Sequence, residues 1–295
     1  MYVCNLKFTF SLIIILIIII IIMQFRTIVD IPSPSFHISP FEKMLFVGSC
    51  FADRIGRRFL QEQFRVTVNP YGVMYNPASV YHTMTRCFSE EERDFRVVFI
   101  TLGTNRVYVL KETGEIVDNC QKRPQRLFLE QQLSVGQCAA YLRRCIHLVA
   151  SHCPQAKVVI TVSPIRYAKY GFHGSALSKA VLLLAAQQVQ DEMPETVGYF
   201  PAYEIVNDEL RDYRFYQPDM LHPSDQSVEY IWERLVETYF SEEARRFLDE
   251  WRPVKEALAH RPFHPDSEAY RSFLESTRLK AMALKEKYPL LQIDI

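Results

Sequence analysis

The sequence predicts an α/β fold, a three-layer, doubly wound domain built on a mainly parallel sheet. Three observations lead to this prediction. Short apolar runs rich in β-branched residues recur along the chain and end at Gly, Ser or Pro, as buried parallel strands do. Segments with apolar residues at helical spacing separate these runs. The chain has 295 residues and is 48% hydrophobic, which is ample for a buried core.

The predicted strands and helices alternate in chain order. Residues 97–102 form the strongest predicted strand, because the run is apolar and rich in β-formers and Gly103 ends it. Residues 107–110 and 116–117 flank a turn with Gly114 and predict a small hairpin. The other strands are expected at residues 45–48, 157–162 and 197–201, and the helices at residues 52–61, 78–87, 134–150, 175–192 and 225–239.

Three local features are also predicted. Residues 66–77 are rich in Asn, Pro, Tyr and Gly and are expected to form a loop. Ser224 is the expected N-cap of the helix at residues 225–239. In the helix at residues 175–192, an apolar stripe is expected to face the core, and it consists of Leu177, Val181, Leu184 and Ala185.

The chain divides into three parts. Residues 24–240 contain the alternating strands and helices and form the predicted domain. Residues 241–295 are richer in charged helix formers and predict a C-terminal helical extension with a last helix at residues 267–287. This extension either caps the domain or binds a partner. Residues 1–23 are a hydrophobic N-terminal segment of a different kind.

The N-terminal segment has an unbroken aliphatic run from Leu12 to Ile22. Its apolar length is close to what crosses a bilayer, so a signal anchor would attach the protein to a membrane through residues 6–23. The alternative is that translation starts at Met23 and the protein is soluble in the cytoplasm. A cleaved signal peptide is disfavoured, because no small-x-small site follows the apolar run.

Charge, cysteines and motifs exclude several classes of protein. The 34 basic and 34 acidic residues balance, so we expect no nucleic-acid partner. Seven dispersed cysteines without a C-x-x-C pair fit free thiols better than a disulfide framework, and no metal site is predicted. The chain has no Walker A, G-x-G-x-x-G, H-E-x-x-H or G-x-S-x-G motif.

Three short segments at predicted strand ends could carry chemistry. Ser49 lies at a strand-to-helix junction, where open α/β sheets bind ligands and helix N–H groups face an anion. Asn105 closes the turn after residues 97–102, and Asp219 and His222 share a loop before a helix. An imidazole can take the proton of a hydroxyl near neutral pH, and a neighbouring carboxylate holds the correct tautomer. These residues therefore predict a nucleophile, an oxyanion donor, a base and its orienting group.

Residues 48–52, Gly-Ser-Cys-Phe-Ala, resemble the defining motif of the GSCFA domain family, which belongs to the SGNH (GDSL-like) hydrolases. The resemblance covers about residues 25–240 and implies an SGNH/flavodoxin-like sheet. Further stretches that look like the same family are residues 69–77, 101–105, 163–166 and 219–223.

The resemblance implies that Ser49 is the nucleophile, with His222 as its base and Asp219 as the orienting carboxylate. The last two match the family's D-x-x-H pattern. Cys50 lies next to the nucleophile and suggests thiol catalysis as an alternative. We interpret Cys50 instead as a small buried hydrophobic residue.

The resemblance also implies three donors for the oxyanion. These are the N–H groups of Ser49 and Gly72 and the side-chain amide of Asn105. Gly56 competes with Gly72 for the second position. Arg106 stands where the family pattern G-x-N-D has an acidic residue, which changes the hydrogen bonds around Asn105.

The expected function is that of a serine esterase that needs no metal and no organic cofactor. Its substrate would be a small-molecule or carbohydrate ester. One alternative is an acyltransferase with the same chemistry, in which an alcohol replaces water. The other is a non-catalytic, membrane-anchored binding or scaffolding protein. The sequence indicates no oligomeric state.

Overall fold

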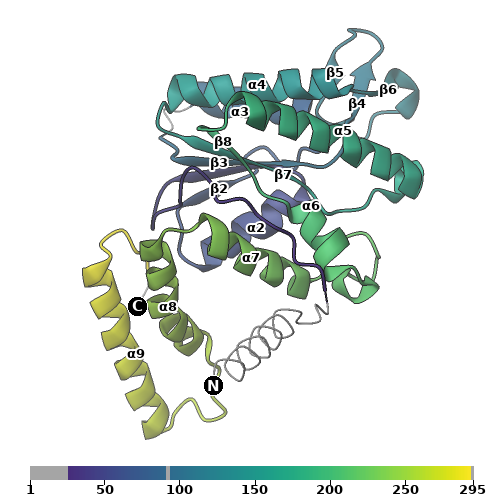
Figure 1. Ribbon diagram of the computed structural model, residues 1–295. Coiled ribbons are helices and arrows are strands. Elements are labelled where there is room, and N and C mark those ends of the chain that lie inside the picture. The colour runs from purple at the N-terminus through teal and green to yellow at the C-terminus, as the bar shows by residue number, and fades with distance from the viewer. Residues whose placement is uncertain (1–25, 91–93, 294–295) are drawn as a thin grey trace, which may run out of the picture.

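A five-stranded parallel sheet forms the centre of the protein, in a computed structural model that describes residues 26–90 and 94–293. The spatial order is β2-β1-β3-β7-β8, and all four neighbouring pairs are parallel (Figure 1). The strands are β1 (Met44–Gly48), β2 (Val66–Val68), β3 (Val97–Leu102), β7 (Lys157–Val162) and β8 (Val197–Tyr199). This arrangement confirms the predicted doubly wound α/β fold.

Helices cover both faces of this sheet. One face carries α2 (Cys50–Gln61), α7 (Asp225–Tyr239) and the short α6 (Ala202–Glu204), which continues as a π-helical turn at Ile205–Leu210 (Figure 1). The other face carries α3 (Pro77–Glu90), α4 (Val135–His152) and α5 (Gly171–Glu192). Short 3-10 turns lie at Gln125–Leu127, Ala168–Tyr170 and Tyr213–Phe215. Ser224 caps α7 as predicted, with its hydroxyl accepting the Ser227 N–H.

Burial explains why the sequences of the central strands β1 and β3 are almost entirely apolar. All five residues of β1 and all six of β3 are buried, because helices cover both faces of a parallel sheet. On one face, the ring of Phe46 stacks on Phe99 at 4.3 Å between centroids, and Phe59 packs beside them. On the other face, Leu45 and Val47 pack with α3, α4 and α5. The sheet therefore separates two apolar layers.

A second, antiparallel sheet extends from the α4 side of the domain. It contains β4 (Arg106–Leu110), β5 (Ile116–Val117) and β6 (Phe128–Gln132), in the order β5-β4-β6. The predicted hairpin is present as β4 and β5. The third strand, β6, was not predicted, because its sequence Phe-Leu-Glu-Gln-Gln is polar and largely exposed.

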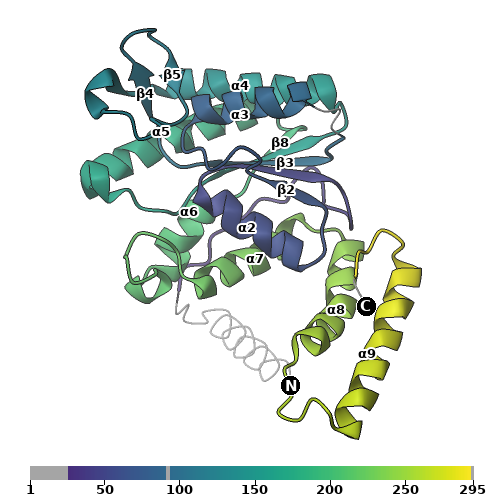
Figure 2. The ribbon, with the colours of Figure 1, turned by 180° about the vertical axis from the view of Figure 1, so that it is seen from behind.

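The C-terminal extension is helical, as expected. It consists of α8 (Glu242–Ala259) and α9 (Glu268–Lys287), which lie side by side at one end of the molecule (Figure 2). Phe247 of α8 is fully buried, with its ring 4.8 Å from that of Phe41 and 6.0 Å from that of Phe64. The base of this helical pair is therefore part of the main core.

Two local predictions need correction. Residues 66–68 form strand β2 rather than a loop, and these short, half-buried residues gave only a weak strand pattern. In α5, Ala185 is buried and Val181 packs partly buried against the core, but Leu177 and Leu184 are 54% and 59% exposed, so only part of the expected stripe faces the core. The buried face is rotated because α5 turns Ser178 and Lys179 inward at the strand ends. The sequence pattern did not predict that α5 buries polar side chains.

The membrane anchor predicted for residues 6–23 lies outside the described residues, as does the alternative start at Met23. Within residues 26–90 and 94–293, no helix has the length and apolar character needed to cross a bilayer.

Candidate active site

The predicted site residues gather where β1 and β3 end side by side. The chain leaves β1 toward α2 on one face of the sheet and leaves β3 toward α4 on the other face. In a doubly wound sheet, this change of direction opens a crevice at the carboxyl ends of the strands, where ligands bind. Gly48 pairs with Thr101 at this point.

Gly48 and Ser49 form a tight strand-to-helix junction. A Cβ on Gly48 would lie 2.1 Å from the Thr101 carbonyl oxygen, and its φ of +139° also requires glycine. Ser49 is fully buried and caps α2, with its hydroxyl accepting the Phe51 N–H at 3.3 Å. The same hydroxyl lies 3.0 Å from the Thr101 hydroxyl, and the Ser49 N–H donates to the Thr101 carbonyl at 3.0 Å. Ser49 thus has its hydrogen-bonding groups satisfied inside the protein.

Cys50 is the first residue of α2 and is only partly buried. Its sulfur lies 3.8 Å from Nε2 of His222, and the Tyr75 hydroxyl also hydrogen bonds to it. Burial raises the pKa of the Cys50 thiol, so a base is needed to form the thiolate.

Asp219 and His222 form the second half of the site. Nδ1 of His222 lies 2.6 Å from Oδ2 of Asp219, while Oδ1 of Asp219 accepts the N–H groups of His222 and Leu221 at 3.0 and 2.9 Å. These hydrogen bonds, led by that from the His222 N–H, lower the pKa of Asp219 to about 2. The carboxylate is therefore ionised and directs the imidazole toward Cys50.

Arg166 holds this loop in place. Its N–H donates to the Leu221 carbonyl, and its guanidinium donates to the Met220 carbonyl, both at 3.0 Å. Arg166 follows β7, whereas His222 lies in the loop before α7. The orientation of His222 thus depends on a contact between two distant segments.

The expected contact between Ser49 and His222 is not formed. An N-cap hydroxyl folds back over the first turn of its own helix, and the following side chain projects outward instead. Ser49 is used in this way, so the group that faces Nε2 of His222 is the Cys50 thiol. The start of α2 decides which side chain faces His222. The sequence predicts that start at residue 52, whereas the helix begins at residue 50.

All three expected oxyanion donors are engaged elsewhere. The Ser49 N–H lies 3.0 Å from the Thr101 carbonyl and 2.9 Å from its hydroxyl and donates to both. The Gly72 N–H donates to the Asn69 carbonyl at 2.9 Å within a turn. The Asn105 amide is buried and donates to the Leu133 carbonyl at 2.8 Å. The competing glycine, Gly56, lies inside α2 and packs against Val68. In the described part of the chain, no hydrogen bond joins Gly72, Asn105 or Gly56 to Cys50.

Lys179 and Tyr167 were not predicted to belong to the site. The Lys179 amine is buried and donates to the carbonyls of Gly103 and Ser163, both at 2.7 Å. Burial lowers the pKa of this amine to about 7. The Tyr167 hydroxyl is buried and has no hydrogen-bond partner in the described structure. One sequence signal could have placed Lys179 in the site. Gly103 and Ser163, whose carbonyls accept its hydrogen bonds, directly follow predicted strands.

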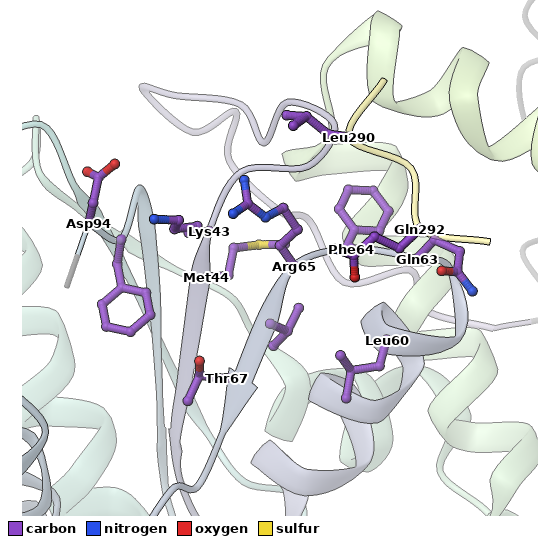
Figure 3. Close-up of a pocket in the computed structure, with 12 residues that line it drawn as sticks. Lys43, Met44, Leu60, Gln63, Phe64, Arg65, Thr67, Asp94, Leu290 and Gln292 are labelled. Atoms are coloured by element: carbon purple, nitrogen blue, oxygen red, sulfur yellow. The ribbon is translucent and has the colours of Figure 1, made fainter. Parts of the chain in front are cut away.

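A hollow lies at the opposite edge of the sheet. It measures about 500 Å³ and is lined by Lys43, Arg65, Asp94 and Leu290 among others (Figure 3). These residues lie at the amino ends of the strands or in the C-terminal tail, away from Cys50 and its partners. Within the described residues, no group of three or more His, Cys, Asp or Glu side chains is placed to hold a metal ion.

Known families and structures share features with this chain. The profile described as GSCFA family matches residues 43–96 and 93–235, and the profile described as GSCFA domain protein, C-terminal domain, matches residues 251–294. No curated protein matches the sequence. The solved acetylxylan esterase Axe2 from Geobacillus stearothermophilus is 12% identical, with a TM-score of 0.46 over 70% of this chain and 98% of that chain. A member of the lipolytic protein G-D-S-L family from Veillonella parvula is also 12% identical, with a TM-score of 0.44 over 67% and 97%.

Proposed function

The chain belongs to the GSCFA family, and we propose that it is an acyl hydrolase that cleaves ester bonds with Cys50 as its nucleophile. One observation carries this proposal. A thiol, an imidazole and an ionised carboxylate contact one another in succession, with 3.8 Å from the Cys50 sulfur to Nε2 of His222 and 2.6 Å from Nδ1 to the Asp219 carboxylate. A nucleophile, its base and a group that orients the base form the minimal machinery for acyl transfer.

The reaction follows from the order of these groups. His222 takes the proton of Cys50, and the thiolate attacks the ester carbonyl. The tetrahedral intermediate collapses when His222 donates that proton to the leaving alcohol, and a thioester remains on Cys50. Water, deprotonated by His222, then attacks the thioester, and the acid leaves as the thiol is restored. Asp219 stays ionised throughout and stabilises the imidazolium.

Ser49 is the competing nucleophile, because the family resemblance implies it. Its hydroxyl caps α2 and contacts Thr101, so it would have to leave both partners before it could reach His222. The substrate class expected from the resemblance remains a small-molecule or carbohydrate ester. The contacts of Cys50 and His222 give no specific support to the two alternatives, an acyltransferase with an alcohol acceptor and a non-catalytic binding protein.

Turnover of short-chain aryl esters by the full chain tests this proposal. Cys50→Ala and His222→Ala should abolish turnover, and Cys50→Ala should also remove the iodoacetamide adduct at position 50, which peptide mass spectrometry distinguishes from adducts at other cysteines such as Cys120. Ser49→Ala is the matched variant at the neighbouring position, and it should lose about 1 kcal/mol of stability while it keeps its thiol chemistry.

Two results would contradict the proposal. If Cys50→Ala keeps turnover, and a fluorophosphonate labels the protein but not Ser49→Ala, then Ser49 is the nucleophile. If the folded wild-type chain hydrolyses no ester and reacts with neither reagent, the protein is not an acyl hydrolase.

A further inference from the structure

The attack of Cys50 on an ester places a negative charge on the carbonyl oxygen, and that oxygen needs hydrogen-bond donors. Removing a single donor of this kind slows acyl-transfer enzymes by about 10²–10³-fold. The Gly72 N–H and the Asn105 amide are both committed to carbonyl groups of the protein. Other donors must therefore lie near Cys50 if the proposed function is right.

The hydroxyl of Tyr167 is an unused donor at this place. It is shielded from solvent and has no hydrogen-bond partner in the described structure. It lies directly over Gly103, where a Cβ would come within 2.2 Å of the hydroxyl oxygen. Gly103 is the first residue after β3, two residues beyond the Thr101 that binds Ser49. The hydroxyl thus lies at the carboxyl end of β3, close enough to Cys50 that this residue, after burial, contributes to the raised pKa of Tyr167.

The surroundings of Tyr167 connect it to Cys50. Its ring packs edge-on against Tyr75, with the centroids 6.1 Å apart, and the Tyr75 hydroxyl hydrogen bonds to the Cys50 thiol. The Tyr167 N–H donates to the Ser175 hydroxyl, and the Lys179 amine lies 5.0 Å from the Tyr167 ring centroid. These contacts fix the ring before any substrate arrives, which is the condition for effective stabilisation of a transition state.

The N–H of Cys50 is the second candidate donor. It lies in the first turn of α2, where helix N–H groups have no intrahelical acceptor, and its hydrogen bond is to its own sulfur. A carbonyl carbon bonded to that sulfur would bring its oxygen toward this N–H. The positive end of the helix dipole favours negative charge at the same position.

We propose that the Tyr167 hydroxyl and the Cys50 N–H together form the oxyanion hole, which makes Tyr167 a catalytic residue. The inference rests on the proposed function. Burial raises the pKa of Tyr167 well above its usual range, so the hydroxyl keeps its proton and remains a donor. A buried donor without a partner in the free protein is explained if its partner is the reacting substrate.

Kinetics of Tyr167→Phe with an aryl acetate ester test the inference. The substitution removes one unpartnered oxygen, so the protein should fold and melt like the wild type. We expect kcat to fall about 10²–10³-fold while KM changes little, because the lost bond forms only in the transition state. Tyr170→Phe, in the ring stacked beside Tyr167, is the matched control and should keep wild-type kcat.

Alkylation separates this inference from the proposed function. Iodoacetamide reacts with a thiolate without forming an oxyanion, so Cys50 in Tyr167→Phe should alkylate at the wild-type rate, whereas Cys50→Ala should lose turnover together with the adduct at position 50. Wild-type kcat in Tyr167→Phe, together with an inactive Cys50→Ala, would overturn the role of Tyr167 alone. Retained turnover in Cys50→Ala would overturn the proposed function itself, and with it this inference.

Discussion

The carboxyl and amino edges of the parallel sheet differ in whether their polar groups are buried or exposed. At the carboxyl edge, hydroxyl, amide and amine groups are buried among the strand ends, namely those of Ser49, Thr101, Thr104, Asn105, Ser163, Ser178 and Lys179. At the amino edge, the exposed Lys43 and Arg65 line the hollow of about 500 Å³. Burying polar groups costs free energy unless they are hydrogen bonded. The buried polar groups therefore mark the carboxyl edge as the candidate site.

The largest expected effect concerns the carboxylate that orients His222. Asp219→Asn keeps the shape of the loop but no longer requires the tautomer with hydrogen on Nδ1, so kcat should fall about 10³–10⁴-fold. The measurement is the steady-state turnover of an aryl ester. Asp212→Asn, at another exposed aspartate that accepts a backbone N–H, should leave turnover unchanged. Equal losses in both variants would mean that the effect is not specific to the site.

The next effect concerns the buried amine at the carboxyl edge. Lys179→Met leaves the carbonyls of Gly103 and Ser163 without their donor, so the free energy of unfolding should fall by about 2–4 kcal/mol. Urea denaturation at pH 7 measures this loss. A loss within experimental error would mean that these two carbonyls find water instead.

The same lysine should make stability depend on pH. Burial lowers its pKa to about 7 in the folded protein, whereas an unfolded chain holds a lysine near about 10.4. Between these values the unfolded state binds more protons, so the free energy of unfolding should rise as the pH increases from about 7 to about 10. This rise should be smaller in Lys179→Met and unchanged in Lys43→Met, at the amino edge. Identical pH profiles for all three proteins would contradict the assignment.

A smaller effect is expected for Asn105. Because its amide donates to the Leu133 carbonyl, Asn105→Ala should cost about 1–2 kcal/mol of stability and leave the folded enzyme largely active. Thermal melting and kcat, measured on the same sample, separate the two quantities. A fully stable Asn105→Ala protein with a hundredfold lower kcat would restore the oxyanion role that the family resemblance implies.

The smallest effect is expected at the amino edge. Lys43→Gln changes an exposed residue beside the hollow of about 500 Å³, so stability should change by less than about 0.5 kcal/mol and turnover should not change. A loss of ester turnover in this variant would reverse the comparison and move the candidate site to the amino edge.

The fold was largely predictable because burial leaves a plain pattern in the central strands. The strands at residues 97–102 and 157–162 match the structure residue for residue, since both lie inside the sheet and consist mostly of buried apolar, β-branched residues. The edge strand β2 and the outer strand β6 are exposed in part, so their sequences lack that pattern.

The position of the candidate site and the contact between Asp219 and His222 were predictable, but the group that faces His222 was not. The segments around Ser49, Gly103 and His222 do meet at the carboxyl edge, as strand-end rules require. Which side chain faces His222 depends on where α2 begins, and a difference of two residues exchanges a helix cap for a reactive group. The buried Lys179 was hidden because apolar periodicity assigns a lysine to the surface.

The separation of Cys50 and His222 along the chain has a consequence for biosynthesis. The two residues are 172 positions apart, and α7 joins α2 through the ion pair between Arg58 and Glu229. During translation, the thiol of Cys50 therefore emerges long before the segment that carries its base. In a nascent chain the Cys50 thiol has no imidazole beside it, and it meets His222 only when the segment that leads into α7 has docked against α2.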